Sequence, residues 1–237
     1  MTTARVALGR AGNAVPTASH LAFQADHAAA RDAVWSALDA AALVAEAASL
    51  DLPILRVASQ AVDRRSYLLR PDQGRRLRPA DLGVLEASAH PGAVVFVAAD
   101  GLCALGVQAQ AVAVVSALLD PLRRLGFVPG PFVVAEQARV ALGDEIGGAL
   151  GALAVVMLIG ERPGLSSTDS LGAYLTWGPR VGRTDAERNC ISNIRPGGLS
   201  PPAAAAKIAW LLAGARAQSG TGVALKDEQP EAPLALG

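Results

Sequence analysis

Residues 94–101 read Val-Val-Phe-Val-Ala-Ala-Asp-Gly, and this stretch is the clearest indication of fold class in the chain. The apolar run Val94 to Val97 predicts a strand that is buried on both faces. Asp100-Gly101 then predicts a turn into a helix over residues 102–119, with Asp100 near the N-cap. The simpler interpretation of Asp100 is capping; the alternative is that free backbone amides lie there beside a ligand cleft.

The same alternation of apolar strand and helix recurs from residue 54 onwards. It predicts an α/β fold whose mostly parallel, Rossmann/flavodoxin-like sheet is flanked by helices. Before it, apolar residues at helical spacing predict one amphipathic helix over residues 17–50. We therefore expect an N-terminal helical arm (1–52), an α/β domain (53–217) and a mobile C-terminal tail (218–237). The further predicted strands are 54–57, 132–134, 155–159 and 173–176, and the further helices are 79–89, 139–150 and 202–217.

Charge and cysteine content exclude several classes of protein. The 237 residues carry 21 basic and 21 acidic side chains, so the chain is not a general polyanion binder and we expect no nucleic-acid partner. Cys103 and Cys190 have neither zinc-site nor disulfide-framework spacing, which favours a reducing, cytoplasmic compartment. The uncharged stretches 101–119 and 146–160 are interpreted as buried elements, and no membrane is expected.

The common catalytic and nucleotide-binding motifs are absent. The candidate functional segments are instead a turn and a long loop that follow predicted strands. There is no GxGxxG after the first strand, no P-loop, no HExxH and no GxSxG. The turn 160–165 follows a strand and carries Glu161 and Arg162, which a turn alone does not require. Residues 177–198 predict a long polar loop, and such loops are usually functional. The arginine run from Arg64 to Arg78 is interpreted as a solvated or subunit-facing patch.

Several blocks in these loops resemble one family. Gly160-Glu-Arg-Pro-Gly-Leu165, Asp169-Ser-Leu-Gly-Ala-Tyr-Leu-Thr-Trp-Gly-Pro-Arg180 and Arg188-Asn-Cys-Ile-Ser-Asn-Ile-Arg-Pro-Gly-Gly-Leu199 closely resemble the small (light, beta) subunit of ethanolamine ammonia-lyase. Further matching blocks extend the resemblance from about residue 5 to residue 227. Several long blocks in the right order are far more specific than a single motif.

The resemblance implies a subunit of an adenosylcobalamin-dependent lyase that converts ethanolamine to acetaldehyde and ammonia by radical chemistry. In this family the large (alpha) subunit holds the substrate and the catalytic side chains, and the small subunit closes one side of the cobalamin site. The cofactor is base-on, with its own dimethylbenzimidazole on cobalt, and the chain accordingly has no DxHxxG histidine motif. Heterodimers assembled into a higher oligomer are expected, in the cytoplasm or inside a bacterial microcompartment.

Three residues correspond to the family's cofactor-binding positions. Val140 would supply apolar contact or a backbone amide at a helix start, and Glu161 would accept hydrogen bonds from the amide side arms of the corrin ring. Cys190 would be a small, soft packing residue. The resemblance implies neither a catalytic residue nor a metal ligand on this chain, and it assigns no role to residues 183–185.

Two other functions stay open on the sequence alone. The chain could be a free-standing flavodoxin-like ligand-binding or scaffold protein that uses the same end of the sheet, a reading with fold-level support only. It could also be an assembly factor that leaves after cobalamin has been loaded.

Overall fold

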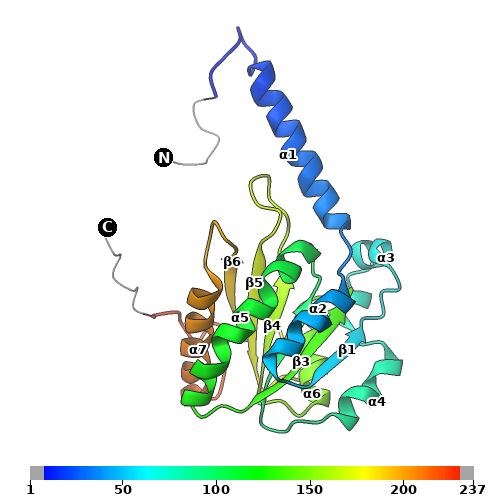
Figure 1. The fold of residues 1–237 in the computed structure, drawn as a ribbon, viewed down its shortest axis with the longest axis vertical. Helices are drawn as coiled ribbons and strands as arrows, with labels where there is room; N and C mark the ends of the chain where they lie inside the picture. Colours follow the sequence, from blue (N-terminus) through cyan, green and yellow to red (C-terminus); the bar gives the residue numbers. More distant parts are fainter. Residues whose placement is uncertain (1–7, 230–237) are drawn as a thin grey trace.

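The computed structural model describes residues 8–229, which form a six-stranded sheet with helices on both faces (Figure 1). The strand order is β1-β3-β2-β4-β5-β6. The strands are β1 (Ile54–Ala58), β2 (Val94–Ala99), β3 (Pro129–Glu136), β4 (Ala154–Gly160), β5 (Leu171–Trp177) and β6 (Arg188–Ile194). The α-helices are α1 (Thr17–Trp35), α2 (Ala40–Ala47), α3 (Arg64–Leu69), α4 (Pro79–Ala87), α5 (Ala104–Arg124), α6 (Leu142–Ala149) and α7 (Pro201–Gln218), and the 3-10 helices are η1 (Ala48–Leu50), η2 (Gln73–Arg75) and η3 (Asp185–Glu187).

The α/β class is confirmed, but the sheet is mixed rather than flavodoxin-like. The pairs β1–β3, β3–β2 and β2–β4 are parallel, whereas β4–β5 and β5–β6 are antiparallel. A parallel connection needs a crossover of a dozen or more residues, usually a helix. The short, helix-free connection 161–170 cannot supply one, so β5 returns beside β4 as a hairpin. The expectation of a mostly parallel sheet was therefore wrong for this half.

Strand β6 lies within the segment that was predicted to be a long loop. Its apolar contribution to the core is limited to Ile191 and Ile194, while Arg188 is also buried. A register irregularity between Leu171 and Ala173 interrupts the pairing of β5 with β6. This spacing does not alternate with period two, which explains why the sequence pattern concealed the strand.

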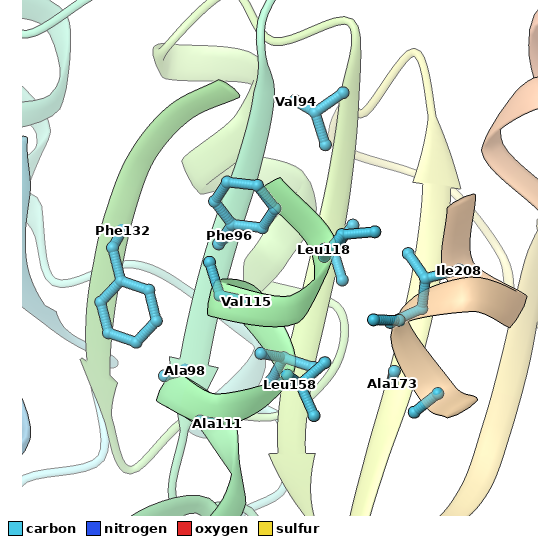
Figure 2. Close-up of a cluster of buried hydrophobic side chains, with 14 of the residues drawn as sticks. Val94, Phe96, Ala98, Ala111, Val115, Leu118, Phe132, Leu158, Ala173 and Ile208 are labelled. Carbon is cyan, nitrogen blue, oxygen red and sulfur yellow. The ribbon is translucent and has the colours of Figure 1, made fainter. Parts of the chain in front are cut away.

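Two layers of small apolar side chains hold the helices on the sheet. One face carries α2, α5 and α7, and the other carries α4 and α6. Figure 2 shows Val115 and Leu118 of α5 lying over Phe96 and Leu158 of the sheet. Valine, leucine and alanine fill most of both clusters, as the low aromatic content, 4 %, requires.

The N-terminal arm is two helices and not the single helix predicted over 17–50. A bend of 77° separates α1 from the α2 segment. At the break, the Ser36 hydroxyl donates to the Ala33 carbonyl, and the Asp39 carboxylate accepts from the Ala42 amide as the N-cap of α2. Helix α2 packs on the sheet, whereas α1 projects away from it with Ala33 as its buried residue (Figure 1).

Residues 219–229, the part of the expected tail that the structure describes, lie against the start of β6. The Asn189 side chain accepts from Gly222 N and donates to Leu225 O, and Thr221 Oγ1 donates to Glu187 O. Lys207 of α7 forms an ion pair with Asp227. Residues 1–7 and 230–237 lie outside the described residues, and the three-part division of the chain stays a prediction.

Among residues 8–229, α5 is long and apolar enough to cross a membrane by length and composition. Of its apolar stretch, 56 % is buried inside the protein, where α5 packs against the sheet beside α7, as a core helix does. The second uncharged stretch, 146–160, forms the end of α6 and the whole of β4, both of which contribute to the core.

Candidate functional site

A cleft of about 810 Å³ opens at the carboxyl ends of β2, β3 and β4. Its floor comprises Gly101-Leu102 after β2, residues 139–141 after β3, and residues 159–162 at the end of β4. Helices α5 and α6, which follow β2 and β3, cover opposite faces of the sheet. The chain therefore separates between these two strands, and open α/β sheets bind ligands at such a point.

The walls of the cleft come from segments far apart in the sequence. One wall is the stretch of α3 and η2, which supplies Tyr67 and Arg75. The opposite wall comprises Tyr174 of β5, residues 183–185 of the connection to β6, and Arg188 at the start of β6. Residues of the predicted loop 177–198 thus line the cleft, although the part of this segment from Arg188 to Ile194 is strand β6.

Asp100 ties the ends of β2 and β3 together beneath the cleft. It is 2 % exposed, and its carboxylate accepts from the backbone amides of Gly101 (3.0 Å), Gln137 (2.9 Å) and Ala138 (3.0 Å). Burial raises the pKa of Asp100 to about 6, against the opposing effect of these amides and of Arg64. Asp100 does not cap α5, whose N-cap residue is Cys103, so the capping prediction was wrong.

Tyr67 lies between two arginines at the side of the cleft. The guanidinium carbons of Arg64 and Arg139 are 4.7 and 4.6 Å from its ring centroid. Arg139 also donates to the Tyr67 carbonyl (3.0 Å), and burial raises the pKa of the Tyr67 hydroxyl to about 12. This stack fixes both the ring and the Arg139 side chain.

Arg64 is not part of a solvated patch, which corrects the interpretation of the arginine run at this position. Its side chain is 11 % exposed and lies 3.6 Å from Asp100 Oδ2. It donates to the carbonyls of Val34 and Gly101 at 2.7 and 2.8 Å. Arg75, from the same run, lines the cleft.

The glycines at the ends of β2 and β4 allow the floor of the cleft to close. A side chain on Gly160 would overlap the carbonyls of Cys103 and Asp100, and one on Gly101 would overlap Gly160 O. Gly101 also has a φ of +56°, in the left-handed region. The turn after β2 can thus approach the end of β4 closely enough for Leu102 N to donate to Gly160 O at 3.0 Å.

Glu161 leaves β4 into the cleft and is held by two donors. Ser170 Oγ donates to Glu161 Oε2 at 2.5 Å, and Asn193 N donates to the same oxygen at 3.2 Å. The half-buried carboxylate is therefore fixed, with Oε1 free of any hydrogen-bond partner within residues 8–229. An acceptor in such a position can receive an N–H group from a ligand.

Val140 lines the same cleft, whereas Cys190 lies beside it. The half-buried Val140 packs against the core cluster under α6. Within the described chain, the backbone N–H groups of Val140 and Ala141 have no acceptor. Cys190 is an exposed free thiol on β6, directly opposite Tyr174 of β5, and its Sγ is 3.4 Å from Ser192 Oγ.

A buried ion pair positions the connection between β5 and β6. Both amino groups of the Arg188 guanidinium bind the Asp144 carboxylate of α6, at 2.7 and 2.8 Å, and the two side chains are 2 % and 4 % exposed. Arg188 also donates to the Arg183 carbonyl at 3.0 Å. Hydrogen bonds from Thr184 and Arg183 lower the pKa of Glu187 to about 2. These contacts hold the wall 183–185 in place.

The described residues contain no group of three or more His, Cys, Asp or Glu that could hold a metal ion. Histidine is likewise absent from the described lining of the cleft. The site that remains is rich in hydrogen-bond donors and has one fixed carboxylate. Such an arrangement suits the binding and orientation of a large polar ligand.

Comparison with known proteins identifies the family of this chain. Residues 1–226 match the family model described as ethanolamine ammonia-lyase light chain (EutC). The chain belongs to the ethanolamine ammonia-lyase light-chain family. The resemblance seen in the loop blocks is thereby confirmed.

Similar light chains are found in several bacteria. The chain is 55 % identical over 229 residues to the ethanolamine ammonia-lyase small subunit of Rhodopseudomonas palustris (strain BisA53), an alignment that covers 96 % of this chain and 88 % of the relative. It is 54 % identical over 242 residues to the small subunit of Bradyrhizobium diazoefficiens, covering 100 % and 92 %. The corresponding protein of Azotobacter vinelandii is 51 % identical over 238 residues, covering 99 % and 88 %.

Sequence reasoning missed several residues that line the cleft of this light chain. No pattern in the sequence predicts a site role for Tyr67, Arg139 or Tyr174. Arg75 belongs to the arginine run that is interpreted as a surface patch, and Arg188 to the predicted loop 177–198. Arg139 directly precedes Val140, which matches a cofactor-binding position of the family, so a role for Arg139 in the same site could have been predicted. Tyr67 reaches the cleft only through tertiary packing, which no local pattern could reveal.

Proposed function

We propose that this chain is the small subunit of an adenosylcobalamin-dependent ethanolamine ammonia-lyase, which converts ethanolamine to acetaldehyde and ammonia. Its role is to close the cobalamin site at the interface with the catalytic large (alpha) subunit. The observation that carries the proposal is the family match over residues 1–226, together with a cleft lined by Val140 and Glu161. The relatives are named small subunits, which supports the existence of a larger partner subunit.

The residues around the cleft fit a corrinoid. The cofactor offers both donors and acceptors: the cleft presents the fixed Glu161 carboxylate to amide donors of the ring's side arms, and the free N–H groups of Val140 and Ala141 to acceptor groups of the ligand. Ile159 and the ring of Tyr174 supply apolar surface beside them. Cys190, across from Tyr174, would contact the ligand from β6. The absence of histidine from the described lining agrees with a base-on cofactor.

When bound, adenosylcobalamin supplies the radical chemistry that removes ammonia from ethanolamine. The share of this chain is to bind and orient the cofactor and to exclude water. Asp100 and the Arg188–Asp144 pair fix the floor and one wall of the cleft, and their charged groups are engaged by partners within the chain. We therefore assign no catalytic residue to this subunit.

Heterodimers of small and large subunits would assemble into a higher oligomer, in the cytoplasm or inside a bacterial microcompartment. The two free cysteines, without a disulfide, are consistent with a reducing compartment.

Co-expression with a large subunit tests the proposal. We expect a stoichiometric complex that co-elutes, gives the visible spectrum of base-on cobalamin after loading and releases ammonia from ethanolamine. The small chain alone, given adenosylcobalamin, is the control and should be inactive. Turnover of ethanolamine by the small chain alone would contradict the proposal, and loss of the small chain after cofactor loading would favour an assembly factor.

A further inference from the structure

The cleft is lined by more basic than acidic side chains, although the chain as a whole has a formal charge of zero. Its lining contains five arginines and two carboxylates, Glu161 and Asp185. Two of the arginines are neutralised at short range, because Arg183 pairs with Glu187 and Arg188 pairs with Asp144. The other three, Arg75, Arg139 and Arg162, form no ion pair within residues 8–229.

Neutral donors line the same cleft as these three unpaired arginines. The N–H groups of Val140 and Ala141 have no acceptor in the described chain, and they directly follow Arg139. Arg139 Nε is buried and has no hydrogen-bond partner either. A buried donor that stays unsatisfied costs free energy, so its native partner is expected to be a ligand group.

Arg139 is also held in place before any ligand arrives. Its guanidinium stacks on Tyr67 and donates to the Tyr67 carbonyl, so it loses little conformational freedom on binding. Arg75 and Arg162 are exposed and can close over a ligand. Guanidinium groups combined with backbone amides are the usual donors to phosphate.

We propose that Arg75, Arg139 and Arg162, with the amides of Val140 and Ala141, form a subsite for a phosphodiester. On the proposed function, on which this inference rests, that group is the phosphate in the nucleotide tail of cobalamin. This phosphodiester is the anionic group of a molecule whose other polar arms are neutral amides. The subsite would then bind the nucleotide tail, while the Glu161 carboxylate accepts hydrogen bonds from the amide side arms of the ring.

The test uses the complex with the large subunit and two ligands, adenosylcobalamin and adenosylcobinamide. The second ligand lacks the nucleotide tail and its phosphate. Dissociation constants are measured by spectroscopic titration for the wild type and for Arg75→Gln/Arg162→Gln. Both substituted side chains are exposed, so the fold is not expected to suffer. Arg123→Gln, on an exposed arginine at the far end of α5, is the matched control.

We expect the double variant to weaken adenosylcobalamin binding about tenfold or more, and to leave adenosylcobinamide binding unchanged. Inorganic phosphate at millimolar concentration should compete with adenosylcobalamin in the wild type but not with adenosylcobinamide. Equal weakening of both ligands, or of neither, would overturn the subsite. Phosphate that binds without affecting adenosylcobalamin would point to a free anion and overturn the assignment to the tail. A wild-type complex that binds neither corrinoid would refute the proposed function itself, and the subsite with it.

Discussion

At the scale of the residue, Asp100 shows how one buried carboxylate organises the site. It accepts three backbone amides that belong to the ends of two neighbouring strands, and Arg64 lies 3.6 Å away. An asparagine at this position would turn an N–H group towards one of these donors. The carboxylate thus matches its surroundings in a way that its amide cannot.

Asp100→Asn is expected to make stability respond differently to pH. The pKa of Asp100 is raised from 3.8 to about 6 by burial. Between these pH values the folded chain binds a proton that the unfolded chain has released. Its contribution to the free energy of unfolding is therefore complete below pH 3.8 and is lost as the pH rises through about 6.

The variant lacks this titration, so its stability deficit relative to the wild type should shrink between about pH 4 and about pH 7, by up to about 3 kcal/mol. Urea unfolding at several pH values in that range measures the change. Asp120→Asn, on the exposed surface of α5, is the control and should alter the free energy of unfolding by less than about 0.5 kcal/mol. A deficit that does not vary with pH would contradict the assignment of the titration to Asp100.

Residues of the candidate site differ in how far the sequence could predict them. Glu161 follows a continuous apolar strand, so its place at the carboxyl end of a buried strand could be predicted from the sequence. Val140 and Cys190 came from the family resemblance. Tyr67 and Arg75 reach the cleft from α3 and η2, and only the packed structure brings them there.

At the scale of the element, the Arg188–Asp144 pair joins α6 to β6. Asp144 belongs to helix α6, and Arg188 is the first residue of strand β6. Thr176 Oγ1 of β5 also accepts a hydrogen bond from Arg188 at 3.0 Å. Strands β1 to β4 were predictable because their buried residues are continuous apolar runs or nearly so. Strand β6 was not, because an arginine occupies one of its buried positions and its partner lies 44 positions away in the chain.

Replacing one partner of this pair should lower the free energy of unfolding far more than replacing both partners with apolar residues. Asp144→Ala leaves the Arg188 charge buried without a counter-ion, and we expect a loss of about 3–5 kcal/mol in the free energy of unfolding. Arg188→Met combined with Asp144→Leu should lose less than the sum of the two single changes. A double-mutant cycle by urea unfolding measures the coupling.

The Arg70–Asp72 pair provides the comparison for that cycle. Its two side chains are 60 % and 61 % exposed, although the N–O distance, 2.7 Å, equals that of the buried pair. We expect a much smaller coupling energy here than in the buried pair, since exposed ion pairs contribute little to stability. Equal coupling in the two cycles would show that burial is not what makes the Arg188–Asp144 pair important.

At the scale of the whole molecule, α1 stands apart from the α/β body (Figure 1). It contributes Ala33 to the buried set, and Val34 O accepts a hydrogen bond from Arg64. The amphipathic pattern of residues 17–50 correctly indicated helix, but a bend of 77° places only the α2 half on the sheet. The sequence shows no proline or glycine at the break, so local chemistry did not mark it.

Deleting residues 1–32 should leave the body folded with almost unchanged stability. The deletion spares Ala33 and the contact between Val34 and Arg64. We expect the midpoint of thermal unfolding to shift by less than about 3 °C, since little apolar surface is lost from the core. Circular dichroism measures the shift, and a loss of cooperative unfolding would contradict the independence of the body from α1.

The segment 219–229 has a consequence for the molecule in a crowded cell. Strand β6 ends the sheet, and an uncovered strand at a sheet edge can recruit a strand from another chain and start aggregation. Thr221 and Val223 use the carbonyls of Glu187 and Ala186, and Gly222 and Leu225 engage the Asn189 side chain. The last described residues thus occupy the space beside the start of this edge, where pairing with a strand of another chain could otherwise begin.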